Sequence, residues 1–229
     1  MAAEDFAPKN RLFVAKEKAK EFIDKRKGDR MGLVVFAGEA MTQCPLTFDR
    51  AILKGLVDYI DFGILEDGTA IGNGLSIAIS RLKDSRAKEK IIILLTDGVN
   101  NRGEIEPVSA AKISQAFGIK IYCIGIGQDK PFRFFVNHPK VGRGYMQSDP
   151  VDMQTLQEVA ALTNGKAFRA TDAQALGTIY DEIDHLEPTT FKVSQHTIYS
   201  EKAHNYILPG FVLLILNLIL GMTVFRRLP

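Results

Sequence analysis

Apolar residues recur along this chain at two alternating spacings. In the first, as at Leu12, Ala15 and Ala19, they share one face of a helix. In the second, as at 91–96 (IIILLT), an unbroken run rich in β-branched residues predicts a strand covered on both faces. The pattern predicts helices near 12–23, 49–59, 71–82, 107–118, 152–162 and 176–186, and strands near 31–38, 42–48, 91–96, 119–127 and 165–171.

This alternation predicts an α/β fold with a mostly parallel sheet and helices on both of its faces. Ligands of such sheets bind outside the carboxyl ends of the strands. Residues 128–150 are polar and contain several glycines and prolines, which predicts a long loop or insertion.

The end of the chain has a different character. Residues 207–225 carry no charge, and such a run is long enough to cross a bilayer. We therefore expect an α/β domain over 1–187, a linker over 188–205 and one transmembrane helix over 206–226. Arg226 and Arg227 favour a cytoplasmic C-terminus, which would place the domain outside the cytosol.

Composition narrows the possible functions. The net charge of +2 gives no reason to expect nucleic acid as a partner. Cys44 and Cys123 stand far apart in apolar surroundings, so we interpret them as small buried hydrophobic residues rather than a disulfide or metal pair.

Two polar residues stand at element ends where such sheets bind ligands. Asp97 directly follows the run at 91–96, and Thr69 precedes the helix at 71–82. Taken singly, each has a plain structural interpretation: Thr69 as a helix N-cap, and Asp97 with Gly98 as a turn. Together they offer oxygen ligands on one rim, which suits a hard cation such as Mg²⁺.

Short patterns typical of enzymes are missing from the sequence. It has no HExxH zinc motif, no GxSxG nucleophile elbow and no GxxxxGK[ST] phosphate loop. We therefore do not expect an enzyme, and no catalytic residue is assigned.

Four segments, taken in order, carry a resemblance to a known family. They are GLVVFAGEAMTQCPLTFDR (32–50), EDGTAIGNGLSIAISRLKDS (66–85), IIILLTDGVNNRGEIEP (91–107) and IKIYCIGIG (119–127).

Over roughly residues 5–187 the chain resembles the von Willebrand factor type A (VWA) domain, most closely its bacterial membrane-bound Bat (aerotolerance-associated, BatA-like) branch. The resemblance implies a Rossmann-like fold and a metal-ion-dependent adhesion site. Such a site binds a partner's carboxylate through Mg²⁺ and performs no turnover. Thr69 matches the threonine of that site, and Asp97 matches its second aspartate.

The resemblance is incomplete at the start of the chain. The family's DxSxS segment, which follows its first strand, has no counterpart here, and Met1 resembles the methionine that ends it in the Bat branch. We therefore expect a sheet that lacks its first strand, an incomplete site, and Mg²⁺ in full-length members rather than in this chain. Truncation and a naturally short chain both explain this, and the abrupt start favours truncation. Either way, unpaired neighbouring strands are expected to make the chain unstable or prone to aggregate.

These observations predict a membrane-anchored protein-interaction module. The Bat resemblance implies other Bat proteins and a MoxR-type AAA+ ATPase as partners, in stress tolerance or envelope maintenance. The expected location is the bacterial inner membrane, with the domain in the periplasm. Two alternatives stay open: a metal-free structural scaffold, and an α/β hydrolytic enzyme that uses Asp97.

Overall fold

The computed structural model describes residues 1–3, 6, 10–128, 131–138, 142–148, 150–188 and 203–223. The chain divides into two units, Met1–Thr190 and Phe191–Pro229, and each is considered by itself. Most of the expected linker over 188–205 lies outside the described residues.

Helices and strands alternate through the first unit, as the apolar spacings predict. Asp152, one of the residues expected to begin a helix, caps α5 by accepting a hydrogen bond from the Thr155 backbone N–H. The elements of this unit are α1 (Arg11–Lys25), β1 (Met31–Phe36), β2 (Ala40–Thr47), α2 (Arg50–Asp58), α3 (Ile71–Leu82), β3 (Ile91–Thr96), α4 (Pro107–Ala116), β4 (Lys120–Ile126), β5 (Phe132–His138), β6 (Gly142–Ser148), α5 (Met153–Leu162), β7 (Ala167–Ala170) and α6 (Ala173–Leu186).

Three strands form the parallel part of the fold, in the order β3-β4-β7. β3 pairs with β4 along its whole length, ending with Thr96 opposite Gly125. On the other side of β4, Cys123 lies opposite Ala167 of β7. The expected parallel sheet is therefore present, and its carboxyl edge is formed by the ends of these three strands.

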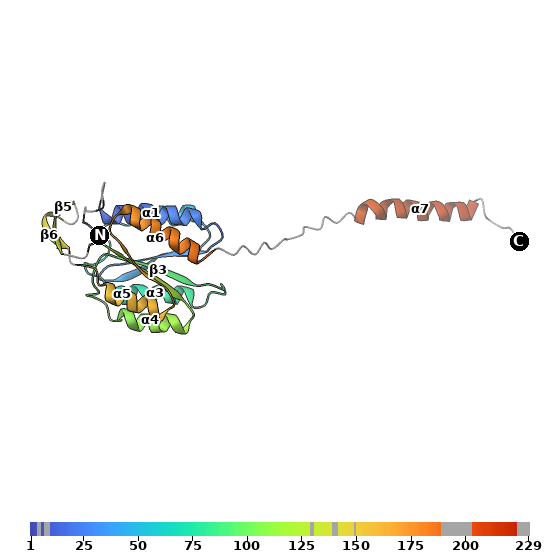
Figure 1. Cartoon of the computed structure of the whole chain (residues 1–229). Helices are drawn as coiled ribbons and strands as arrows, with labels where there is room; N and C mark the ends of the chain where they lie inside the picture. The colour runs from blue at the N-terminus through green and yellow to red at the C-terminus, as the bar shows by residue number, and fades with distance from the viewer. Residues whose placement is uncertain are drawn as a thin grey trace. The chain divides into compact units, whose positions relative to one another are not determined.

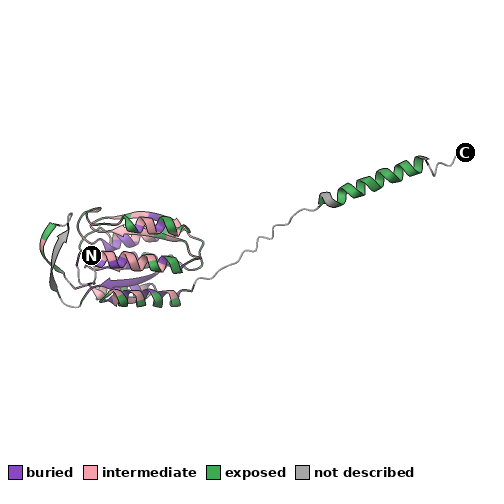
Figure 2. Ribbon diagram, turned by 90° about the horizontal axis from the view of Figure 1, so that it is seen from above, coloured by how far each residue is buried: buried purple, intermediate pink, exposed green. Residues whose placement is uncertain are grey.

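Helices cover both faces of this sheet, with α1 and α6 on one side and α3, α4 and α5 on the other (Figure 1). Alternate residues of β3 face the two layers. Ile92 and Leu94 belong to the core formed with α3, α4 and α5, while Ile93 and Leu95 pack against the core formed with α1 and α6. The unbroken apolar run at 91–96 is explained by this burial on both faces, which Figure 2 shows as purple and pink strands between the helices.

β1 and β2 form a separate antiparallel pair. α3 contacts β1 and also contacts β3. Among the described residues, however, β1 pairs only with β2, and β3 pairs only with β4. Hydrogen bonding is therefore interrupted between β1 and β3, although one helix packs on both.

Of the expected long loop or insertion over 128–150, the loop alternative is wrong for the described part. β5 and β6 pair antiparallel, from Phe132 opposite Ser148 to His138 opposite Gly142. A hairpin of this kind satisfies its backbone groups locally and so does not need the long apolar run that marks a buried strand. The glycines and prolines that suggested a loop also suit a hairpin turn, and Gly142 has a φ of +97°.

The second unit contains one described helix, α7 (Ala203–Thr223). Its apolar side chains are exposed, as the green helix in Figure 2 shows. No helix within the described residues is long and apolar enough to cross a membrane. The expected transmembrane helix over 206–226 is thus not supported within the described residues, in which α7 ends at Thr223.

Candidate functional site

The two residues predicted to form a site come together at the carboxyl edge of the sheet. β3 ends at Thr96, and Asp97 and Gly98 follow it directly. The Thr69 hydroxyl faces this segment, because a Cβ added at Gly98 would lie 3.0 Å from Thr69 Oγ1. Glycine at 98 therefore lets the loop that carries Thr69 approach the loop that carries Asp97.

Thr69 does not cap α3, so the plain structural interpretation of this residue does not hold. The N-cap of α3 is Ala70, which has no side-chain capping bond. Instead, the Ile71 N–H donates to Asn100 Oδ1 at 2.8 Å, so a residue of the β3 loop satisfies the helix start.

Asn101 attaches the backbone of Thr69 to the same loop. The Thr69 N–H donates to Asn101 Oδ1 at 2.8 Å, and the Asn101 N–H donates to the Thr69 carbonyl at 3.1 Å. Sequence reasoning assigned no role to Asn100 or Asn101. The available signal was a pair of asparagines directly after a strand-end Asp-Gly, since asparagine side chains commonly bond neighbouring backbone groups.

Asp97 has cationic neighbours. Arg11 Nη1 lies 3.4 Å from Asp97 Oδ2, and the Met1 α-amino group contacts the same oxygen. The Arg11 side chain is 1% exposed and the Asp97 side chain 21% exposed. Sequence reasoning missed Arg11 because it stands beside a run of lysines that reads as a solvated helix face.

The residues present do not fit a divalent cation. Mg²⁺ prefers an octahedral set of oxygen ligands, usually with one or two carboxylates. Thr69 and Asp97 supply two oxygen donors, but Arg11 is already paired with Asp97. No group of three or more His, Cys, Asp or Glu side chains within the described ranges is placed to hold a metal.

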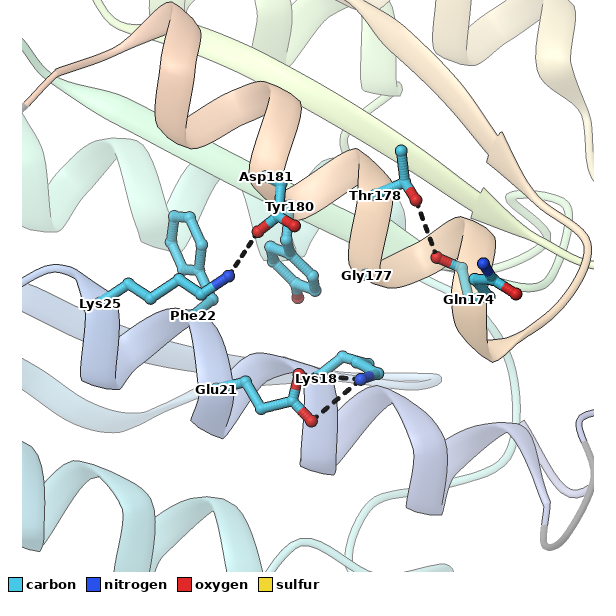
Figure 3. Close-up of a pocket in the computed structure, with 9 residues that line it drawn as sticks. All are labelled: Lys18, Glu21, Phe22, Lys25, Gln174, Gly177, Thr178, Tyr180 and Asp181. Atoms are coloured by element: carbon cyan, nitrogen blue, oxygen red, sulfur yellow. Dashed lines mark hydrogen bonds and ion pairs between the residues drawn. The ribbon is translucent and has the colours of Figure 1, made fainter.

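A hollow of about 240 Å³ lies elsewhere, between α1 and α6 (Figure 3). Its charged side chains are bonded to one another: Lys25 pairs with Asp181, and Lys18 pairs with Glu21. The Lys25–Asp181 pair joins the two helices, and the Lys18–Glu21 pair lies within α1. The described charged groups of the hollow are thus already paired, so we do not take it as the functional site.

A second cluster of titratable groups lies at the end of α6. Glu187 Oε1 accepts hydrogen bonds from the Lys120 ammonium and the Tyr122 hydroxyl, each at 2.7 Å. Burial and the bond to Glu187 raise the pKa of Tyr122, and the same carboxylate raises the pKa of Lys120. The three groups satisfy one another, which makes this a structural cluster.

An α/β sheet with helices on both faces and a polar rim at the carboxyl ends of its strands defines the class of fold: a Rossmann-like domain, in which ligands commonly bind at that rim. The family model of the von Willebrand factor type A domain matches residues 10–182. The chain therefore belongs to the von Willebrand factor type A domain family.

Solved structures of similar proteins include two from Bacteroides. An aerotolerance-related membrane protein from Bacteroides fragilis is 27% identical, with a TM-score of 0.69 over 81% of this chain and 91% of that one. The conserved hypothetical protein BatB from Bacteroides thetaiotaomicron is 28% identical, with a TM-score of 0.69 over 81% and 92% of the two chains. Both support the expected likeness to the Bat branch.

A relative in Borreliella burgdorferi, an uncharacterized protein, is 37% identical over 174 residues. The match covers 75% of this chain and 51% of the relative, so the chain spans about half the length of that protein.

Proposed function

We propose that this chain is a protein-interaction module whose binding surface is the rim formed by Thr69, Asp97 and the 98–102 loop. The observation that carries the proposal is the way Asn100 and Asn101 attach this loop to the start of α3. A rim braced in this way presents its polar groups in a fixed arrangement, and such preorganisation lowers the cost of binding.

The rim also exposes an apolar side chain. Val99, directly between Gly98 and Asn100, is 41% exposed. An apolar contact surrounded by polar groups is a common composition for the centre of a protein interface. A partner protein therefore suits this surface better than a small ligand, for which a deep and mostly apolar pocket is the usual site.

Two other functions are less well supported. A metal-free scaffold would need no braced rim. A hydrolytic enzyme would need a base or nucleophile beside Asp97, whereas the described side chain paired with its carboxylate is the Arg11 guanidinium. Mg²⁺, which the family resemblance implies for full-length members, takes no part in the binding proposed for this chain.

The proposal extends to the membrane and to partners. The exposed apolar side chains of α7 support attachment of the domain to a membrane. We place it at the inner membrane with the domain in the periplasm, because Arg226 and Arg227 favour a cytoplasmic C-terminus. One similar structure is that of a membrane protein. Other Bat proteins and a MoxR-type ATPase are the first partners to test. Protease treatment of intact spheroplasts, which lack an outer-membrane barrier, checks this location. A periplasmic domain is digested at once, whereas a cytosolic domain resists digestion until the cells are lysed.

Site-specific photo-crosslinking in cells tests the binding surface. A photoreactive amino acid replaces Val99 in the full chain, and the control replaces Phe117, a residue of similar exposure (44%) that follows α4. We expect discrete protein adducts from position 99 and none from position 117. Equal adducts at both positions, or none at 99, would contradict the proposal.

A further inference from the structure

The position of Arg11 points to a role beyond partner binding. Arg11 is the first residue of α1, and its side chain is buried at the carboxyl edge of the sheet. Its backbone N–H donates to the Ala3 carbonyl at 2.9 Å, which secures the start of the helix. The guanidinium therefore enters the rim from an anchored backbone position.

Gly127 provides the space for this guanidinium. It follows β4 directly, and a Cβ added there would lie 3.1 Å from both Nη1 and Nη2 of Arg11. Its φ of +141° is also one that residues with a side chain rarely adopt. The close approach of Arg11 and the positive φ are thus two independent reasons for glycine at position 127, where the chain leaves β4 and passes the Arg11 guanidinium.

The chemistry of arginine makes this a permanent cation. A guanidinium stays protonated throughout the accessible pH range. Because it is part of the chain, it is present at the Asp97 carboxylate at a high effective concentration. A divalent cation that approached Asp97 would meet this positive charge. Among the described residues, the further ligand predicted for it is the Thr69 hydroxyl.

We propose that Arg11 is the built-in counter-ion of Asp97, and that it replaces a divalent cation at the rim of this chain. The Asp97 carboxylate is then paired without metal, and the structure of the rim does not respond to Mg²⁺ or to chelators. The proposal concerns the rim of the proposed function, but its test needs no partner, so failure of one does not imply failure of the other.

Mn²⁺ binding to the full chain, followed by electron paramagnetic resonance, tests this proposal. We expect wild type and Asp97→Asn to bind Mn²⁺ equally weakly. Arg11→Gln should gain at least about tenfold in affinity, and that gain should disappear in the Arg11→Gln/Asp97→Asn double variant. The control is Arg86→Gln, which removes an exposed arginine and should bind like wild type.

A wild-type chain that binds Mn²⁺ at least about tenfold more tightly than Asp97→Asn would overturn the proposal. If the Arg11 variant does not fold, thermal unfolding of wild type decides the matter. A ligand that binds only the folded state raises Tm. Equal Tm values in saturating Mg²⁺ and in chelator would support the proposal, and a clear rise in Tm with Mg²⁺ would overturn it.

Discussion

Arg11 and Asp97 form an ion pair across the carboxyl edge of the sheet, although 86 positions separate them in sequence. The guanidinium is buried and the carboxylate mostly so. The pair joins the start of α1 to the end of β3, and it therefore contributes to stability as well as to the charge of the rim.

Removing the carboxylate should destabilise the fold. Asp97→Ala leaves the buried guanidinium without this partner, and we expect a loss of about 1–3 kcal/mol in the free energy of unfolding. Urea unfolding of wild type, Asp97→Ala, Arg11→Met and the double variant measures the coupling. A coupling energy near zero in this cycle would show that the pair does not contribute.

Asn100 should stabilise the start of α3. Asn100→Ala removes the acceptor for the Ile71 N–H, and loss of such a cap costs about 0.5–2 kcal/mol. Asn100→Asp keeps an acceptor oxygen and places a negative charge at a helix N-terminus, which is favourable. Thermal unfolding should therefore rank wild type and Asn100→Asp above Asn100→Ala, and equal stability of all three would refute the capping role.

Asp152 should give the chain an acid-sensitive stability. The hydrogen bond from the Thr155 hydroxyl lowers the pKa of the Asp152 carboxyl most, and the bond from the Thr155 backbone N–H lowers it further. A lowered folded-state pKa stabilises above the unfolded value of about 3.9, and this contribution is lost as the pH falls through the folded value.

Urea unfolding near neutral pH and below about pH 3 tests this prediction. Asp152→Ala should cost about 0.5–2 kcal/mol near neutrality. Asp152→Asn keeps a capping oxygen but cannot titrate, so its deficit relative to wild type should shrink in acid. A deficit independent of pH would argue against a role for the charge.

The interrupted hydrogen bonding between β1 and β3 should favour self-association. Unpaired strand edges pair readily with other chains, and lysine on an edge opposes such pairing. We expect the average molar mass of the full chain in detergent, measured by light scattering, to rise with protein concentration. Val34→Lys in β1 should suppress this rise, whereas Val34→Thr should not. A monomeric wild type with a cooperative, high-temperature melt would contradict the prediction.

The layered fold was predictable because its signals are local. The run at 91–96 reads as a two-sided buried strand, and the helical spacing at Leu12, Ala15 and Ala19 predicts α1. Asp152 was likewise predictable as a cap, because capping depends on residues a few positions apart. The hairpin of β5 and β6 was missed because turn residues are common to hairpins and irregular loops.

The candidate site was predictable only in part. Thr69 and Asp97 were proposed from their places at element ends and from the family resemblance, and the structure brings their loops together. Arg11, Asn100 and Asn101 were not identified, because their roles depend on contacts between distant segments. Nothing in the local sequence separates a buried arginine from the lysines that follow it in α1.

The central claim is that the rim binds a partner protein. The most direct test compares the yield of the photo-crosslinked adduct at position 99 with and without the substitution Thr69→Val. This substitution keeps the backbone bonds to Asn101 and replaces the hydroxyl by a methyl group. A hydrogen bond contributes about 0.5–1.5 kcal/mol, so we expect partner affinity to fall about 2- to 10-fold and the adduct yield with it. The matched change Thr178→Val, on α6, should leave the yield unchanged. An undiminished yield from Thr69→Val would contradict the account.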